Sequence, residues 1–140
     1  MSHKHLTITA DPARLKDVRH AVMELAFPCL PAKAHLVALA VDEAVANAIL
    51  HGTLPQGGGG IHATIDVDIH SDGQRLEVRI GDGGPAYDPR QADMPDLHAR
   101  VRSRQRGGLG LQIIRRVMDE VHYARLDNQR NELRLVKYID

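Results

Sequence analysis

Two alternating segments in the middle of the chain predict a β-hairpin with one dry face. Apolar residues alternate with polar ones between residues 61 and 70, and again between Leu76 and Ile80. The pair Asp72-Gly73, which lies between them, is a strong hairpin signal. Because successive side chains of a strand point to opposite faces, only one face of this hairpin is apolar. The hairpin therefore favours a sheet that packs against a single layer of helices.

Patterns on both sides of the hairpin predict the rest of this architecture. Asp11-Pro12 is typical of a helix start, and that helix is expected to end before Pro28. The expected order is strand, helix, helix, two strands, helix, two strands, at about residues 6–8, 12–27, 32–50, 61–70, 76–80, 111–118, 121–126 and 132–139. The predicted fold class is α+β: a two-layer sandwich with a mixed, mainly antiparallel sheet and helices on one face.

Length and charge indicate one ordinary globular domain. The 140 residues suit a single domain, taken as residues 1–140. Lysine plus arginine and aspartate plus glutamate each number 18, so the formal net charge is zero. A sequence-independent nucleic-acid binder would carry a net basic patch, so direct binding of nucleic acid is not expected.

The cysteine content and the N-terminal sequence favour the cytoplasm. Cys29 is the only cysteine, so neither an internal disulfide nor a CxxC metal site is possible. The first ten residues have no apolar stretch after their basic residues, which argues against a signal peptide. No segment approaches the roughly 20 apolar residues of a membrane span. We expect a cytoplasmic protein without membrane contact.

The first candidate site is a carboxylate and an amide in the second predicted helix. Glu43 and Asn47 are four residues apart and share one helical face with Leu36, Leu39 and Leu50, a stripe that otherwise resembles a buried one. In one interpretation Asn47 supplies an oxygen to a metal ion and Glu43 orients or deprotonates a nucleophile. In the other the two residues form a helix–helix hydrogen-bonding pair or a partly exposed edge.

The second candidate site follows the hairpin. By the two-residue period of the strand, Asp82 continues the apolar face and should point into the helix layer, where it could accept from an exocyclic amine. Gly83 and Gly84 would let the backbone approach a ligand closely. Taken alone, however, Asp-Gly is more typical of a surface turn.

The third candidate site is a run of glycines that leads into the third predicted helix. Arg106, Gly107, Gly108, Leu109 and Gly110 stand at this helix start. Exposed N–H groups and the helix dipole favour an anion there, and Arg106 adds a charge suited to phosphate. The segment matches neither a P-loop nor the dinucleotide fingerprint, and a flexible loop is the alternative.

Together these motifs resemble the three nucleotide-binding boxes of the GHKL ATPases. The matching segments are Glu-Ala-x-x-Asn-Ala-x-x-His from Glu43, Asp-x-Gly-x-x-Tyr-Asp-Pro from Asp82, and Gly-Gly-Leu-Gly-Leu-x-x-Ile from Gly107. Within that superfamily the whole chain is similar to the anti-sigma-factor serine/threonine kinases. The resemblance implies a Bergerat-type site for ATP and Mg²⁺.

The resemblance also implies a role for each motif residue. Asn47 would hold Mg²⁺, and Glu43 would act as the base toward an acceptor hydroxyl. Asp82 would bind the adenine amine, with Gly84 against the base. The remaining residues would contact the phosphates beneath a flexible ATP lid at about residues 83–107: Arg106, Gly107, Gly108, Leu109 and Gly110.

The partners implied are those of partner-switching control of transcription. The family phosphorylates a serine or threonine of a small anti-anti-sigma protein of the STAS type, and many members bind a sigma factor and form homodimers. Two alternatives stay open: an ATP-binding sigma-factor antagonist without kinase activity, and a stand-alone histidine-kinase-like ATPase domain. The length leaves no room for a phosphoacceptor helical hairpin, which disfavours the latter.

Overall fold

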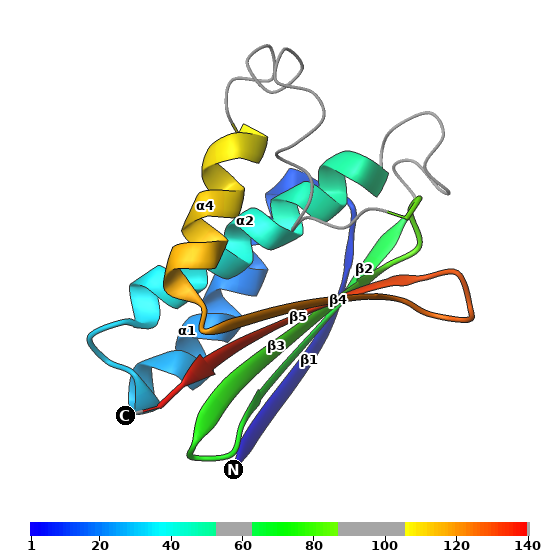
Figure 1. The fold of residues 1–140 in the computed structure, drawn as a ribbon. Helices are drawn as coiled ribbons and strands as arrows, with labels where there is room; N and C mark the ends of the chain where they lie inside the picture. The colour runs from blue at the N-terminus through cyan, green and yellow to red at the C-terminus, as the bar shows by residue number, and fades with distance from the viewer. Residues whose placement is uncertain (53–62, 87–105, 140) are drawn as a thin grey trace.

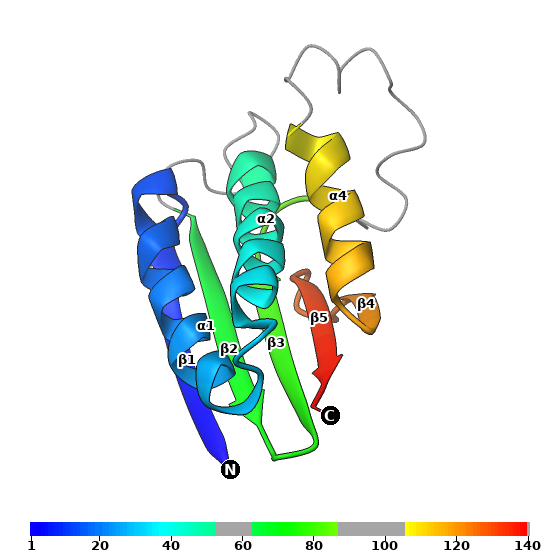
Figure 2. The same cartoon turned by 90° about the vertical axis from the view of Figure 1, so that its left-hand side faces the viewer.

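A five-stranded sheet carries three helices on one of its faces (Figures 1 and 2). The computed structural model describes residues 1–52, 63–86 and 106–139. The elements are β1 (Ser2–Thr9), a 3-10 turn (Pro12–Arg14), α1 (Leu15–Cys29), α2 (Ala34–Gly52), β2 (Thr64–Ser71), β3 (Arg75–Asp82), α4 (Arg106–Val117), β4 (Glu120–Arg125) and β5 (Asn131–Tyr138). The α+β sandwich with helices on one face is confirmed.

The strands lie in the order β1-β2-β3-β5-β4, and all four pairings are antiparallel. The sheet of the described residues is therefore antiparallel rather than mixed. The pairing of β3 with β5 is not sequential, and its register sets Asp82 opposite Asn131. Chain segments far apart in the sequence thus meet at one end of the sheet.

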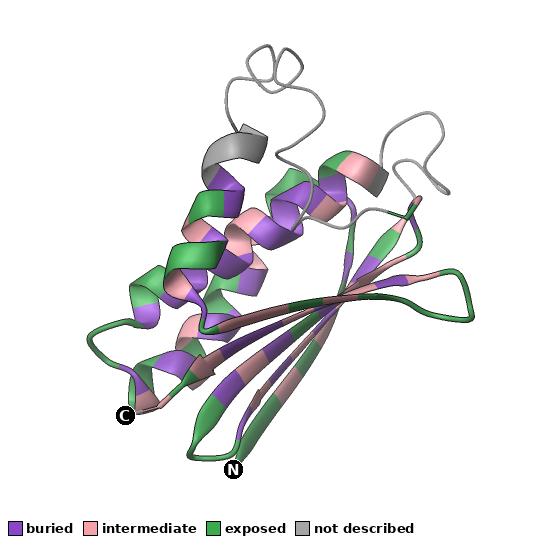
Figure 3. Ribbon diagram, in the orientation of Figure 1, coloured by how far each residue is buried: buried purple, intermediate pink, exposed green. Residues whose placement is uncertain are grey.

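The central hairpin forms as its alternation predicts. The alternate residues from Ile65 to Ile80 that face the helices are buried, and Figure 3 shows this banding along the strands. At the turn the Asp72 carboxylate accepts from the backbone N–H groups of Gln74 and Arg75, both at 2.9 Å. Gly73 has φ +89°, which a residue with a side chain rarely adopts.

The first helix ends later in the sequence than predicted. Asp11 caps the 3-10 turn through the N–H of Ala13, as expected, but α1 continues through Pro28 to Cys29. A proline lacks one N–H, yet in the last turn of a helix this removes a single backbone hydrogen bond. The N–H of Leu30 then donates to Ala26 at 2.7 Å and closes the helix. The expected stop before Pro28 is wrong for this reason.

Helix α2 packs between α1 and α4 over the sheet, as Figure 2 shows. Its window Ala34–His51 has a mean hydropathy of 1.2, so by length and composition it could cross a membrane, and 56% of that window is buried. The sequence expectation overlooked this segment. Three packing neighbours explain why a core helix is apolar on nearly every side.

Candidate functional site

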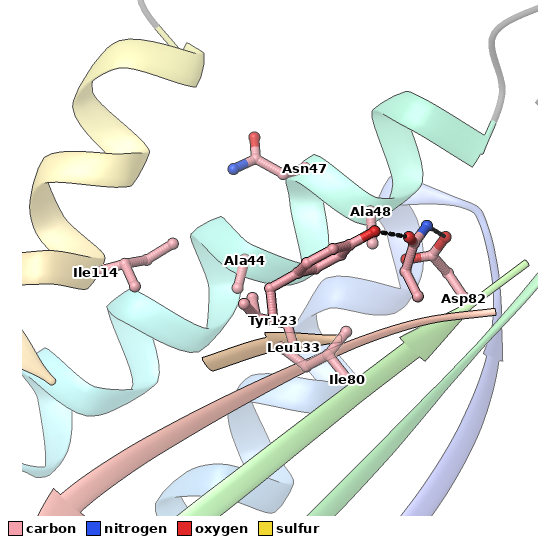
Figure 4. A pocket seen from close by; sticks show the side chains of 9 residues that line it. Ala44, Asn47, Ala48, Ile80, Asp82, Ile114, Tyr123 and Leu133 are labelled. Atoms are coloured by element: carbon pink, nitrogen blue, oxygen red, sulfur yellow. Dashed lines mark hydrogen bonds between the residues drawn. The ribbon is translucent and has the colours of Figure 1, made fainter. Parts of the chain in front are cut away.

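A small pocket lies where β3 ends and β5 begins, under α2 (Figure 4). Its volume is about 30 Å³, which holds one or two water molecules but not a purine base. Two of the three predicted motifs supply lining residues, Asn47 and Asp82, and Ile114 of α4 is a third lining residue. The lining residues come from both layers: Ala44, Asn47, Ala48, Ile80, Asp82, Ile114, Tyr123, Asn131 and Leu133.

Asn47 enters this pocket from α2 with an unsatisfied amide. Its side chain is 4% exposed, and its Nδ2 is buried without a hydrogen-bond partner among the described residues. Leaving a buried donor unpaired costs about 1–3 kcal/mol. Ala44 and Ala48 line the pocket beside Asn47, and Figure 4 shows the Asn47 amide directed away from Asp82. A ligand that supplied a polar partner at this position would remove that cost.

Glu43 lies one turn before Asn47, half-buried and in contact with α4. A Cβ added at Gly110 would stand 2.6 Å from Glu43 Oε1 and 3.3 Å from its Cβ. Real atoms do not approach so closely, so the helix contact depends on a glycine at position 110. This close approach was not expected from the sequence, where Gly110 was considered only as a phosphate contact.

Of the predicted stripe on α2, only Asn47 is fully buried. Leu36 is 49% exposed, Leu39 is 42% exposed and Leu50 is also exposed. The prediction that this stripe is buried is therefore wrong for its leucines. Helix α4 packs beside α2 and covers only part of this face, so its outer edge remains open to solvent.

Asp82, at the end of β3, lines the pocket on the helix side of the sheet. Its inward direction agrees with the two-residue period of the strand. Its Oδ1 accepts from the N–H of Gly84 at 2.9 Å and from Asn131 Nδ2 at 3.0 Å. The first bond is of the Asx-turn kind, so the turn and the inward carboxylate occur together rather than as alternatives.

Asp82 also acts on a titratable neighbour in α2. Burial lowers the pKa of the His51 imidazole below its ordinary value of 6.5, and the negative charge of Asp82 partly opposes this. The neutral imidazole is therefore favoured at neutral pH. His51 belongs to the same motif as Asn47 and lies one helical turn after it, in the last turn of α2.

Asn131 is the site residue that the sequence analysis missed. It is 5% exposed, and besides Asp82 its Nδ2 donates to the carbonyl of Pro85 at 2.9 Å. Its Oδ1 accepts from the Tyr123 hydroxyl at 2.5 Å and from Arg125 Nη1 at 3.2 Å (Figure 4). The available signal was a polar residue at the start of an apolar strand, but only the β3–β5 register reveals its partner.

The glycine run lies inside α4 rather than before it, because the helix begins at Arg106. The correction leaves the argument for an anion intact. The first four N–H groups of a helix have no partner within it, and here they belong to residues 106–109. The side chain of Arg106 and the central part of the expected lid, residues 87–105, lie outside the described residues.

The described residues offer little to a metal ion besides the Asn47 amide. In the ranges 1–52, 63–86 and 106–139, no three His, Cys, Asp or Glu side chains are grouped closely enough to hold a metal. Mg²⁺ usually takes only one or two protein ligands and completes its shell with water and phosphate oxygens. Such an ion fits a single amide oxygen better than it fits a cage of protein ligands.

Comparisons with known proteins agree with this geometry. A model of the histidine kinase-like ATPase domain matches residues 8–137. The chain is 35% identical over 89 residues to the serine/threonine-protein kinase BtrW of Bordetella bronchiseptica, covering 64% of this chain and 60% of that protein. It is 35% identical over 81 residues to the anti-sigma F factor of Priestia megaterium, covering 58% and 53%.

Each match thus spans less than two thirds of the relative's own length. The family model, by contrast, covers nearly the whole chain and all three motifs that resemble the nucleotide-binding boxes. The chain therefore belongs to the histidine kinase-like ATPase domain family, and the resemblance to its anti-sigma-factor kinase branch is confirmed.

Proposed function

We propose that this chain is an ATP- and Mg²⁺-dependent serine/threonine kinase that phosphorylates an anti-anti-sigma protein of the STAS type. By the same proposal it binds a sigma factor, so that phosphorylation of the acceptor switches partners and controls transcription. The observation that carries the proposal is the half-buried Glu43 carboxylate one helical turn before Asn47, which lines the same pocket as Asp82. Pure nucleotide binding would not require a carboxylate at position 43.

Adenine recognition falls to the β3 end of the pocket. Both hydrogen bonds that Asp82 accepts fall on Oδ1, which leaves Oδ2 to accept from the exocyclic amine of the base. Gly84 would lie against the ring. Because the pocket holds only about 30 Å³, its walls must separate for the base to enter.

At the phosphate end, Asn47 Oδ1 would hold Mg²⁺, which would neutralise the charge that develops during transfer. The unpaired Nδ2 of the same amide is a donor and suits a phosphate oxygen rather than the metal. Glu43 takes the proton of the acceptor hydroxyl, and the hydroxyl oxygen bonds to the γ-phosphorus. The bond from that phosphorus to the bridging oxygen breaks, and ADP leaves with the electron pair. The N–H groups of residues 106–109 and the side chain of Arg106 would bind the phosphate oxygens.

A second function has one specific observation in its favour. Gly110 of α4 lies against Glu43, so that a Cβ at that position would stand 2.6 Å from the carboxylate Oε1. A base covered in this way suits an ATP-binding antagonist of a sigma factor that transfers no phosphate. The cytoplasmic location, the homodimer and the single-domain organisation remain predictions of the same proposal.

Single-turnover transfer from labelled Mg·ATP to the purified acceptor tests the proposal. The acceptor is the small STAS-type protein expected in a neighbouring reading frame. Glu43→Gln keeps the shape and loses the base, so nucleotide affinity should persist while transfer falls by roughly 10²–10⁴-fold. Glu24→Gln, an exposed change on α1, is the matched control. Equal transfer by Glu43→Gln and the parent would remove Glu43 from the role of base.

The chemistry of the label separates the alternatives. Acid-stable phosphate on the acceptor indicates serine or threonine, whereas acid-labile phosphate would indicate a histidine-kinase-like domain. If the parent binds ATP but transfers no phosphate to the acceptor, the antagonist function replaces the kinase.

A further inference from the structure

An apolar groove runs between α2 and α4, on the side of α2 that faces away from α1 (Figure 2). Its volume is about 410 Å³, far larger than that of the pocket described above. Leu36 and Leu39 from α2 and Ile113 and Val117 from α4 form its apolar part. The two leucines are 49% and 42% exposed, so the fold of this domain does not use their apolar surface fully.

The polar lining of this groove has one sign of charge. Lys33, Arg116 and Lys137 complete it, and none of the described residues that line it is acidic. Lys137 Nζ lies 3.5 Å from Asp119 Oδ1, so this cation is shared with a nearby carboxylate. An apolar floor with a cationic rim is complementary to a segment that carries both apolar side chains and carboxylates.

The groove leads directly to Glu43, the proposed general base. Residues 36, 39, 43 and 47 share one face of α2 at spacings of three and four, and Leu39 precedes Glu43 by one helical turn. On the facing helix Gly110, which contacts Glu43, is one turn before Ile113. A protein seated on the leucines would therefore hold its neighbouring residues within one turn, about 5–6 Å, of the Glu43 carboxylate.

We propose that this α2–α4 groove docks the acceptor protein through an acidic segment with apolar side chains, and so brings its hydroxyl to Glu43. This inference rests on the proposed kinase function and names a surface of the same site. This docking surface lies beside Glu43 and is separate from the nucleotide pocket. It would therefore set the KM for the acceptor without changing the affinity for ATP.

The test is a steady-state measurement on the full chain with the STAS-type protein from the neighbouring reading frame as acceptor. The double variant Leu36→Ser/Leu39→Ser should raise the KM for the acceptor at least about tenfold, because apolar anchors dominate such interfaces. The kcat at saturating acceptor and the affinity for ATP should change less than about twofold. Leu126→Ser removes an equally accessible leucine, 38% exposed, from the β4–β5 turn and should change none of these quantities.

The rim has its own test. Arg116→Glu should raise the KM for the acceptor, and the difference from the parent should shrink as salt screens the charges. An unchanged KM in both groove variants, or an equal rise in Leu126→Ser, would overturn the proposal. So would groove variants that abolish self-association and leave acceptor binding intact, because the occupant would then be a second copy of this chain.

Failure of the kinase function can be told apart from failure of this inference. If the parent transfers no phosphate, the proposed function fails, and calorimetric binding of the same acceptor to the parent, the leucine variant and Leu126→Ser decides the docking surface. Weaker binding in the leucine variant alone supports the surface; equal binding in all three refutes it.

Discussion

Substituting Gly110 by alanine is expected to push Glu43 out of place. The added Cβ would lie 2.6 Å from Glu43 Oε1, 3.5 Å from its Cδ and 3.3 Å from its Cβ. The carboxylate can swing away, because it ends a flexible side chain, but the Cβ of Glu43 can move only with α2. Overpacking of this kind costs about 1–3 kcal/mol, whereas alanine in place of glycine within a helix gains about 1 kcal/mol. The expected net loss of unfolding free energy is about 0–2 kcal/mol.

A double-mutant cycle isolates the contact from the helix propensity. In a Glu43→Gly background both the carboxylate and the Cβ are absent, so Gly110→Ala should be neutral or stabilise the protein by up to about 1 kcal/mol. The coupling free energy between the two positions should therefore be about 1–2 kcal/mol, read from urea unfolding of the four proteins. Gly81→Ala is the control, because its added Cβ would meet nothing closer than 3.7 Å.

Additive effects of the two substitutions would refute this reasoning. A coupling below about 0.3–0.5 kcal/mol is the range of independent sites and would mean that α4 does not rest on Glu43 in solution. The same single variant has a functional readout. With the carboxylate displaced, Gly110→Ala should slow single-turnover transfer to the acceptor while leaving the affinity for ATP within about twofold of the parent.

Three further predictions concern the end of the pocket that is proposed to bind adenine. Asp82→Asn should weaken ATP about tenfold or more by calorimetry, from loss of a charge-assisted hydrogen bond, and equal affinity would remove Asp82 from the site. Asn131→Ala should lower the unfolding free energy by roughly 2–4 kcal/mol, because it removes a hydrogen-bond partner from both Tyr123 and Asp82 inside the protein. A loss of less than about 0.5 kcal/mol, measured by urea unfolding, would contradict this. Because the pKa of His51 is lowered in the folded protein, the unfolded state binds more protons just below pH 6.5, and the unfolding free energy should fall as the pH drops through that value. The fall should be smaller in His51→Gln. Equal slopes of unfolding free energy against pH in the two proteins would refute the assignment.

Local patterns predicted the elements that depend on local chemistry. The hairpin from Ile65 to Ile80 formed where alternation and the Asp72-Gly73 turn placed it, because strand period and turn preference act over a few residues. The end of α1 was misplaced for a related reason. A proline is interpreted as a helix stop, but Pro28 lies in the last turn, where a single backbone bond is lost, and that depends on where the helix ends.

The parts of the site that depend on packing between distant segments could not be predicted. Leu36 and Leu39 share a face with the buried Asn47, and only the position of α4 decides which of them is covered. Asn131 gave no strong signal, because its importance comes from lying opposite Asp82 across two strands that are not neighbours in the chain. The motifs named the candidate site residues, whereas two close contacts among them, Glu43 with Gly110 and Asp82 with Asn131, required the three-dimensional arrangement.

The cross-strand bond between Asp82 and Asn131 joins residues 49 positions apart, and the sequence between them includes residues 87–105. Folding must close this loop before β3 and β5 can pair. The entropy of closing a flexible loop grows only with the logarithm of its length, so each doubling costs about 0.6 kcal/mol. Insertions or deletions between Pro85 and α4 should therefore change the unfolding free energy little, and this part of the sequence can diverge in length and composition while the sheet that carries Asp82 stays intact.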